Sequence, residues 1–376
     1  MLKFKYQILF LVIGIVLLTS LWANNIYLLV IFSILTYAIL PVRKYWDGTT
    51  WAILAFSFVY STVVLITKQY TSGFILISLL ISPVGFYRFG RWLMSCFREE
   101  KIRHYIILYL ILCYILPLLI ITFKDIAIVG IVNTSRVMLG DVDDTGGLSA
   151  TGYGLIASFG IGGIASLFTK SKPVFIKVTY AVLSILSLLV VVHLVNRTGL
   201  ITFLCCFILT AILSAKSSKS RNLVIIVIVG TIIMLILKSV GGPITEVIEA
   251  YQYREMHSID ATQLGGRSAI WMDALAKLAT HPLGWSRIHY AHNMWLDIAR
   301  VGGWGALFLF IIVTYNWFKS VIKVTRKSIS PFPLIIISIN IAMFLSSFVE
   351  PIIEASVLYF ALLMLILGVT TRISLE

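Results

Sequence analysis

Arginine and histidine side chains are the residues of this sequence best suited to chemistry on a phosphate group. Arg267 follows two glycines, Arg197 lies in a short polar turn between two apolar runs, and His292 precedes Asn293. An arginine is planar and permanently charged, so it can hold a phosphate through two parallel hydrogen bonds. A histidine can gain or lose a proton near neutral pH and can therefore act as a base. We predict that His292, Arg267 and Arg197 are catalytic residues.

Four further residues are predicted to contact the substrate: Arg136, Arg254, Arg287 and Asn293. The alternative for each arginine is that its side chain reaches lipid headgroups or lies on a solvated face. The alternative for His292 is an ordinary surface histidine in a loop. Arg197 favours a functional interpretation because an ionised side chain close to the membrane interior is costly and is by default a functional candidate.

The sequence offers two weak candidates for a metal site, and we expect neither a metal nor a cofactor. His289 and His292 have the spacing His-x-x-His, but two ligands without a carboxylate at a fixed spacing are weak evidence. Asp141, Asp143 and Asp144 could hold a divalent cation, although short acidic runs in loops are usually just solvated. The four cysteines form no Cys-x-x-Cys pair, and their positions indicate no disulfide framework.

The composition indicates a membrane protein rather than a soluble enzyme, a disordered chain or an ordinary nucleic-acid binder. Of the 376 residues, 59% are hydrophobic and only 12% are charged, whereas soluble domains have about 45–50% and about 25%. Mean hydropathy is +0.99. The net charge of +14 does not require nucleic acid, because membrane proteins concentrate Lys and Arg in their cytoplasmic loops. We therefore predict an all-α, polytopic membrane protein.

Twelve apolar stretches are long enough to cross a bilayer, which takes about 20 residues. They cover approximately residues 7–23, 25–41, 51–67, 73–88, 105–123, 151–169, 174–196, 198–214, 222–240, 302–318, 332–349 and 355–372. With the N-terminus inside, twenty of the thirty Lys and Arg but only four of the sixteen Asp and Glu fall on the inner side. This bias follows the positive-inside rule and predicts that both termini are cytoplasmic.

Two long polar loops, residues 124–150 and 241–301, are predicted on the outer side of the membrane. Loops of this length in a compact protein are usually functional. The chain has no convincing internal repeat, which counts against a transporter built from paired repeats. We expect residues 1–376 to form a single integral membrane domain whose function lies in its outer loops.

The second loop is predicted to contain three amphipathic helices. Apolar residues recur at helical spacing over 243–256, then from Arg267 to His281-Pro282, and again from about His292 to Gly302-Gly303. Helices of this kind lie at the membrane surface. They could cover a cavity between the spans, or they could simply shield the bundle.

Four short motifs follow one another in this loop. They are Gly266-Arg267-Ser-Ala-Ile-Trp271-Met-Asp-Ala-Leu275, His281-Pro-Leu-Gly284-Trp, His292-Asn293-Met-Trp-Leu296 and Val301-Gly302-Gly303-Trp-Gly305. Their order, with some twelve spans and one dominant late outer loop, resembles the O-antigen polymerase and O-antigen ligase superfamily. The chain departs from the pattern in having Asn196-Arg197-Thr198-Gly199 where the family often has Ser-Arg-Gly.

The resemblance implies an enzyme of the bacterial inner membrane that moves a glycan from an undecaprenyl diphosphate carrier to a sugar hydroxyl. By this resemblance the reaction inverts the anomeric centre and needs no metal. His292 would be the base, Arg267 and Arg197 would stabilise the diphosphate leaving group, and Arg136 or Arg254 would bind phosphate or glycan. The implied partners are the undecaprenyl-diphosphate-linked oligosaccharide, membrane lipid and, for a polymerase, a chain-length regulator.

The superfamily leaves open which acceptor is used. A polymerase transfers to another lipid-linked repeat unit, whereas a ligase transfers to the lipid A core. We favour a polymerase because the chain is short and its outer loops leave little room for a platform that binds the lipid A core. A flippase for the same glycan also has about twelve spans, but it should carry charges inside them, and here His193 is the one clear exception.

Overall fold

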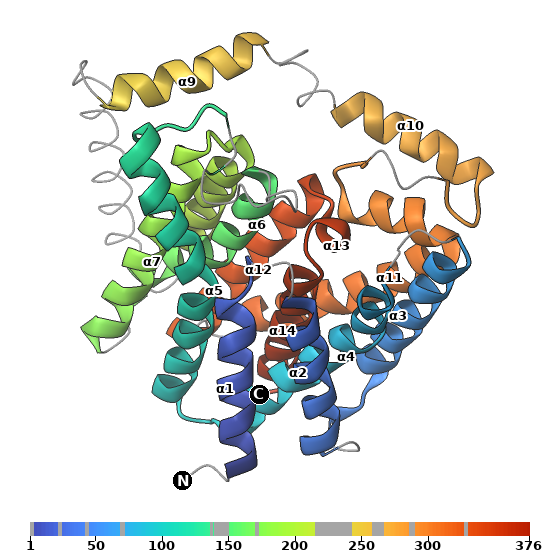
Figure 1. The fold of residues 1–376 in the computed structure, drawn as a ribbon. Helices are drawn as coiled ribbons and strands as arrows, with labels where there is room; N and C mark the ends of the chain where they lie inside the picture. The colour runs from blue at the N-terminus through green and yellow to red at the C-terminus, as the bar shows by residue number, and fades with distance from the viewer. Residues whose placement is uncertain are drawn as a thin grey trace. The chain divides into compact units, whose positions relative to one another are not determined.

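The structure of the chain is a computed structural model, and every regular element in its described part is a helix (Figure 1). It describes residues 4–21, 25–41, 45–67, 72–135, 138, 150–169, 173–214, 243–257, 267–285, 290–326 and 330–376. Nine helices in these ranges are long and apolar enough to cross a membrane, and two shorter ones are also apolar. The predicted all-α, polytopic membrane fold is therefore confirmed. The predicted span over 222–240 lies outside the described residues.

The chain divides into two compact units, residues 1–114, 266–327 and 343–376 in the first and residues 115–265 and 328–342 in the second. The first unit contains α1 (Phe4–Leu18), α2 (Asn25–Ile39), α3 (Gly48–Ile66), α4 (Gly73–Cys96), α10 (Arg267–Thr280), α11 (Met294–Arg326), α13 (Ile352–Ala355) and α14 (Val357–Ser374). The second contains α6 (Ala150–Ile161), η3 (Gly162–Phe168), α7 (Val174–His193), α9 (Pro243–His257) and an unlabelled helix, Arg197–Ser214. Two helices, α5 (Glu100–Val129) and α12 (Pro331–Val349), have residues in both units.

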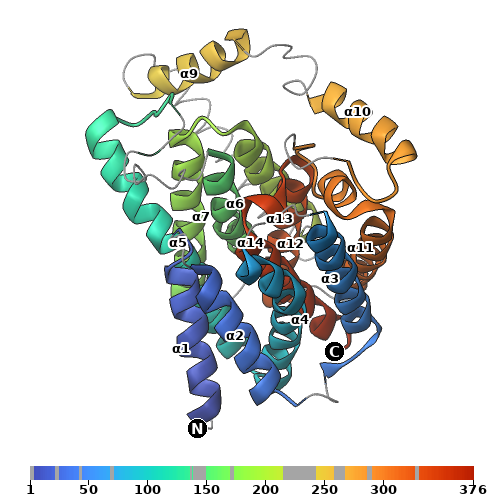
Figure 2. The ribbon, with the colours of Figure 1, turned by 45° about the vertical axis from the view of Figure 1, so that its right-hand side comes forward.

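The centre of the first unit is α4, which packs against α14, α2 and α3, while α11 packs against α3 (Figure 2). Glycines allow α4 and α14 to approach each other closely. A Cβ on Gly90 would overlap the carbonyl oxygen of Leu365, and one on Gly368 would overlap that of Tyr87. Small residues let membrane helices pack backbone against backbone. The two helices α4 and α14 therefore pack with their backbones in close contact.

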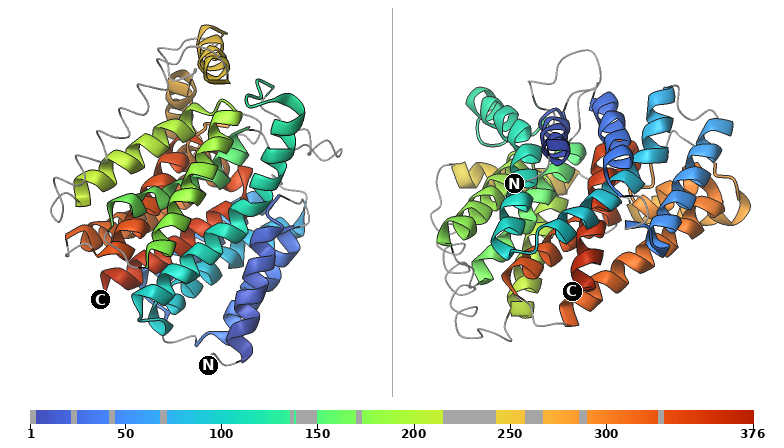
Figure 3. Two further views of the ribbon diagram at one scale, coloured as in Figure 1. Left: turned by 90° about the vertical axis from the view of Figure 1, so that its left-hand side faces the viewer. Right: turned by 90° about the horizontal axis from the view of Figure 1, so that it is seen from below.

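In the second unit, α6 and η3 pack against α7 (Figure 3). The Ser184 hydroxyl of α7 donates a hydrogen bond of 3.0 Å to the carbonyl oxygen of Ile161, where α6 ends. A Cβ on Gly163 would lie 2.8 Å from the carbonyl oxygen of Tyr180, so the first turn of η3 needs a glycine there. This close packing buries the end of α7, including His193, which is fully inaccessible to solvent.

The three helices predicted within residues 241–301 are confirmed. They are α9, α10 and the first part of α11. The third ends at Gly303, whose φ of 68° and ψ of −169° interrupt α11 before the membrane-spanning part begins. A side chain rarely adopts such a φ, which accounts for the glycine at this position.

The kink in α11 is held by residues 281–285, which follow α10. The backbone N–H of Trp304 donates to the carbonyl oxygen of Pro282 (2.9 Å), and that of Trp285 donates to the carbonyl oxygen of Arg300 (2.9 Å). A Cβ on Gly284, where φ is 92°, would lie 2.5 Å from the same Arg300 oxygen. The Pro-Leu-Gly and Val-Gly-Gly motifs of the sequence are therefore two sides of one backbone junction.

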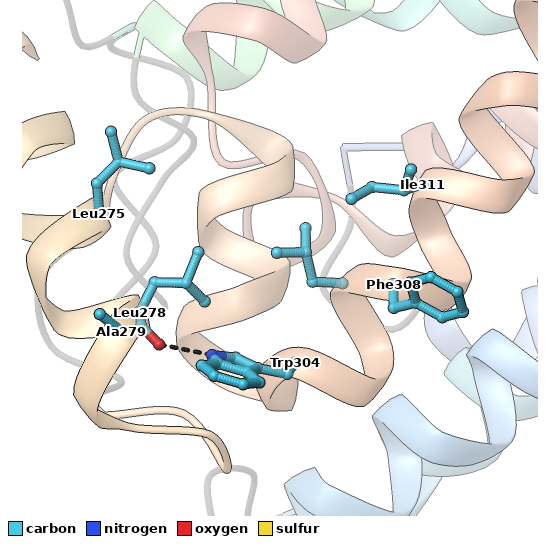
Figure 4. A pocket seen from close by; sticks show the side chains of 7 residues that line it. Leu275, Leu278, Ala279, Trp304, Phe308 and Ile311 are labelled. Carbon is cyan, nitrogen blue, oxygen red and sulfur yellow. Dashed lines mark hydrogen bonds between the residues drawn. The ribbon is translucent and has the colours of Figure 1, made fainter.

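An apolar groove of about 370 Å³ lies between α10 and α11 (Figure 4). It is lined by Leu275, Leu278, Ala279, Trp304, Leu307, Phe308 and Ile311. The Trp304 indole N–H donates to the carbonyl oxygen of Leu278 and ties the two helices together beside the groove. Because Leu275 and Phe308 remain largely exposed, this surface suits a helix that rests in the membrane interface.

Candidate active site

The backbone around His292 is fixed by the residue that follows it. The Asn293 Oδ1 accepts hydrogen bonds from the backbone N–H groups of Trp295 (3.1 Å) and Leu296 (3.2 Å), which caps the start of α11. Its Nδ2 donates to the carbonyl oxygen of Phe348 at 3.0 Å. His292 itself has a φ of 51°, in the left-handed region. A non-glycine residue in this conformation is uncommon and clusters at functional sites.

A buried ion-pair network at the start of α11 holds the same loop in place. The Asp297 Oδ1 accepts from the backbone N–H of Ala291 (2.7 Å), and its Oδ2 accepts from that of Asn293 (3.1 Å). Arg300, which is 1% exposed, donates to Asp297 through Nε at 3.1 Å and pairs with Glu354. Asp297 therefore ties both neighbours of His292 to α11, and Arg300 pairs with both Asp297 and Glu354.

Glu350 is the functional candidate that the sequence did not reveal. Its Oε1 lies 3.2 Å from a terminal nitrogen of Arg267, and its Oε2 lies 3.6 Å from the Nδ1 of His292. The Glu350 side chain is 5% exposed, whereas those of Arg267 and His292 are 24% and 35% exposed. All three belong to the first unit. The structure thus brings together two of the predicted catalytic residues around a nearly buried carboxylate.

The pair of His292 and Glu350 is not a closed hydrogen bond. At 3.6 Å the two atoms are beyond normal hydrogen-bonding distance. Both the Nδ1 of His292 and the Oε2 of Glu350 are buried atoms without a hydrogen-bond partner among the described residues. Catalytic hydrogen bonds are often long before the substrate binds and shorten in the reacting complex. The distance therefore allows this hydrogen bond to close in a reacting complex.

Arg197 lies in the second unit, at the start of the helix Arg197–Ser214. The preceding Asn196 accepts a hydrogen bond from the backbone N–H of Gly199 (3.0 Å) and donates to the carbonyl oxygen of Ala150 (3.0 Å). One terminal nitrogen of Arg197 is buried and has no hydrogen-bond partner among the described residues. A buried guanidinium nitrogen without an acceptor is costly, so this position suits an anionic ligand.

A second histidine–carboxylate pair, also not foreseen, is buried in the second unit. The His193 Nε2 lies 2.8 Å from Asp125 Oδ2, and its Nδ1 lies 2.9 Å from the carbonyl oxygen of Ile131. Asn133 donates to the same Asp125 oxygen at 2.6 Å. Both partners of the pair have side chains that are fully buried. Asp125 lies just beyond the predicted span 105–123, and α5 continues past it to Val129.

Several predicted residues lie outside what the structure describes. Arg136, Arg287, His289 and the acidic run at 141–144 are outside the described residues, and Arg254 lies on α9 with an undescribed side chain. Within the described ranges, no group of three or more His, Cys, Asp or Glu is arranged to hold a metal ion. The predicted roles of these residues stay predictions.

Comparison with known proteins adds one result. The family model described as O-Antigen ligase matches residues 182–300. The resemblance to the O-antigen polymerase and ligase superfamily is confirmed. The matched region includes Arg197, Arg267 and His292, but it ends before Glu350. No curated protein matches the chain.

The family match and the helices point in the same direction. The chain is a multi-pass membrane protein, and its residues 182–300 are similar to the O-antigen ligase family. The match supports a membrane enzyme that transfers glycosyl groups and acts on lipid-linked oligosaccharides.

Proposed function

We propose that the protein is an O-antigen polymerase, an inverting glycosyltransferase that joins undecaprenyl-diphosphate-linked repeat units at the periplasmic face of the bacterial inner membrane. The observation that carries this proposal is the cluster of Arg267, His292 and Glu350 inside a chain of O-antigen ligase/polymerase type. The cluster combines a base that is partly open to solvent with a guanidinium beside it, which is what glycosyl transfer from a lipid diphosphate requires.

In the proposed reaction, His292 takes the proton from the acceptor hydroxyl through its Nε2. The hydroxyl oxygen forms a bond to the anomeric carbon, and the bond from that carbon to the diphosphate oxygen breaks in the same displacement. The electron pair of the broken bond passes to the diphosphate. Glu350 orients the imidazole through Nδ1 and stabilises the imidazolium that forms, in the way that a buried carboxylate acts on a catalytic histidine.

The arginines are proposed to stabilise the negative charge that grows on the diphosphate. Arg267 is already held by Glu350, so it is positioned before the substrate arrives and needs little reorganisation. We propose the same role for Arg197 because one of its terminal nitrogens is buried and has no hydrogen-bond partner among the described residues. Arg136, Arg254 and Arg287 are proposed as further phosphate or glycan contacts. Asn293 is proposed to act by positioning His292, since both ends of its amide are bonded within the protein.

We further propose that both termini lie in the cytoplasm and that the long loops 124–150 and 241–301 lie in the periplasm. The excess of Lys and Arg in the other loops supports this orientation. A polysaccharide chain-length regulator is the proposed protein partner, and no metal or cofactor takes part in the proposed steps.

The second candidate is an O-antigen ligase that transfers the glycan to the lipid A core. The description of the matching family as O-Antigen ligase favours it. Against it stands the size of the two long polar loops, 124–150 and 241–301, which offer little structure for binding the core. The donor chemistry of His292, Arg267 and Glu350 would be the same in both enzymes.

A gel of lipopolysaccharide from a strain that lacks the gene tests the proposal. A polymerase predicts a single repeat unit on the core and loss of the ladder, restored by the wild-type gene but not by His292→Ala at matched membrane levels. Core without any repeat, with long polymer left on the lipid carrier, would identify a ligase. Single lipid-linked units that accumulate on the cytoplasmic face would contradict both and identify a flippase.

A further inference from the structure

A polar pocket of about 160 Å³ lies in the first unit among α4, α14 and the turn before α3. It is lined by Tyr45, Arg91, Ser95, Arg98 and Arg372. Three of these five side chains are guanidinium groups, and no carboxylate is part of the lining that the described residues form. Its volume exceeds the roughly 30 Å³ share of a water molecule several times, so a group larger than water fits.

Arg91 is the innermost cation of this pocket and has donor capacity to spare. One of its terminal nitrogens, Nη1, lies 2.8 Å from Asp47 Oδ2 and 3.2 Å from the carbonyl oxygen of Tyr45. Its side chain is only 10% exposed. Its Nε is buried without a hydrogen-bond partner among the described residues, and so is the Nε of Arg372. Two buried donors from different helices therefore need an acceptor that the described protein does not provide.

The pocket keeps an excess of positive charge after its internal pairs are counted. Asp47 neutralises Arg91, while Glu376 pairs with Arg103 at 2.6 Å and lies 3.8 Å from the Nε of Arg372. Arg98 adds a further exposed cation, with Glu99 and Glu100 after it in the chain but outside the lining. A planar guanidinium is well suited to bind phosphate oxygens.

The surrounding structure fixes these donors in place. Asp47 caps α3 through the backbone N–H of Thr50 (2.8 Å), and it also accepts from the Tyr87 hydroxyl (2.9 Å). The Arg91 side chain, which extends from α4, is thus held against the start of α3. Arg372 stands on α14, which packs tightly on α4 through Gly90 and Gly368. The site is therefore built before any ligand arrives.

The pocket and the candidate active site lie at opposite ends of α14. Glu350 and Glu354 precede the helix, whereas Arg372 is near its end. Its 18 residues span about 27 Å at about 1.5 Å per residue, close to the roughly 30 Å of a bilayer's hydrocarbon core. The pocket is therefore at the opposite membrane surface from the active site. Trp51, which is 61% exposed and lies 4.8 Å from the ring of Trp46, is an aromatic of the kind found at that depth.

We propose that this pocket binds the phosphate group of an anionic lipid headgroup at the membrane surface opposite the active site. Basic pockets between membrane helices on the cytoplasmic side bind such headgroups, and the buried Arg91 and Arg372 donors supply specific contacts in addition to charge. The bound lipid links α4, α14 and the start of α3. It therefore stabilises the first unit without taking part in the transfer reaction.

The test uses the full-length protein in neutral detergent. Thermal unfolding and native mass spectrometry are measured with cardiolipin, phosphatidylglycerol, phosphatidylcholine or inorganic phosphate added. The test variant carries Arg98→Gln and Arg372→Gln, which leave the Arg91–Asp47 pair intact. The matched control carries Lys323→Gln and Arg326→Gln in the last turn of α11, which removes the same charge outside the pocket.

We expect the two anionic lipids to raise the unfolding temperature and to bind the test variant about tenfold or more weakly, as the loss of charge-assisted hydrogen bonds implies. The control should bind like wild type. If inorganic phosphate gives the same variant-dependent stabilisation without lipid, the phosphate site is supported and its ligand is free phosphate. Equal weakening in test variant and control, or equal binding in wild type and test variant, would overturn the proposed site.

Discussion

Two of the histidine–carboxylate pairs formed by the described residues differ in burial, in distance and in how many of their polar atoms have partners. His193 and Asp125 are fully buried, 2.8 Å apart, and both ring nitrogens of the histidine have partners. His292 and Glu350 are 3.6 Å apart, and the His292 side chain is 35% exposed. A buried polar network that is fully satisfied makes a structure rigid. The second pair is only partly satisfied and lies partly open to solvent.

The difference teaches how to assign roles to the two histidines. In the first pair, both ring nitrogens of His193 have partners and both side chains are closed to solvent. In the second pair, the Nδ1 of His292 and the Oε2 of Glu350 have no hydrogen-bond partner among the described residues, and the His292 side chain is partly exposed. The contrast predicts that changes at His292 affect activity, whereas changes at His193 affect stability.

The largest expected effect on activity follows from removing the base. His292→Ala should lower the rate of polymer formation by about 10²–10⁴-fold, the usual contribution of a general base. Arg267→Ala should likewise leave an inserted but inactive protein, because the growing charge on the diphosphate loses its partner. The measurement is conversion of lipid-linked repeat units by purified protein, with unfolding temperature recorded in parallel.

His281→Ala is the matched control, since His281 is an exposed histidine at the end of α10. Its rate should stay close to wild type. Full polymer synthesis by His292→Ala or Arg267→Ala at matched membrane levels would show that the site assignment is wrong.

The next largest effect concerns stability and the other pair. Asp125→Asn removes one charge from a buried, hydrogen-bonded pair and should destabilise the protein by about 3–5 kcal/mol. The reaction rate of the molecules that remain folded should be nearly unchanged. Thermal unfolding and the rate per folded molecule are the two quantities to compare.

The same substitution at an exposed pair provides the control for this prediction. Asp273 pairs with Lys277 at 2.8 Å on the surface of α10, and exposed helix pairs contribute only about 0.3–0.5 kcal/mol. Asp273→Asn should therefore shift the unfolding temperature little. A loss of turnover in folded Asp125→Asn would show that the buried pair takes part in the reaction. The two histidines would then not differ in role as proposed.

Glu350→Gln is expected to have a smaller effect than loss of the base itself. The amide keeps the shape of the side chain but loses the charge that orients His292 and stabilises its imidazolium. We expect kcat to fall by about 10–100-fold, corresponding to the loss of charge-assisted hydrogen bonds, with little change in KM. Steady-state kinetics with a lipid-linked donor measure this split.

Glu246→Gln on α9 removes an exposed glutamate and should leave both constants unchanged. If Glu350→Gln raised KM and left kcat intact, Glu350 would be a binding residue rather than a positioning residue for His292.

The smallest expected effect is the loss of the cap beside His292. Asn293→Ala should destabilise the protein by about 1 kcal/mol, the typical value for a helix cap, and should also lower activity because His292 loses its fixed backbone. Asn293→Ser keeps a capping oxygen, although it loses the amide donor to Phe348, and should recover part of the stability. Thermal unfolding of the two variants shows whether the cap accounts for the loss, and equal stability of the two would show that it does not.

The helices of this protein could be predicted from its sequence because hydropathy and helical periodicity are local properties. Eleven of the twelve predicted spans fall on described residues, where nine coincide with helices long and apolar enough to cross a membrane and two with the shorter apolar helices α1 and α2. The stripes within residues 241–301 predicted α9, α10 and the start of α11. Residue type and motif order predicted Arg267 and His292 as candidate catalytic residues, and in the structure both lie beside Glu350.

Glu350 and Asp125 could not be predicted in the same way. Each is a lone acidic residue near the end of an apolar run, and nothing beside it in the chain points to its partner. Arg267 is 83 residues from Glu350 in sequence, and His193 is 68 residues from Asp125. Such pairs are decided by which helix ends meet in the folded chain.

The sequence by itself therefore determined that this is an all-α membrane protein, since burial in a bilayer demands long apolar helices whatever their arrangement. Only the tertiary structure decided which histidine–carboxylate pair is sealed and which is partly open to solvent. That distinction depends on packing between residues far apart in the chain, because a histidine beside a carboxylate is held rigidly only where the surrounding chain encloses both and satisfies their polar atoms.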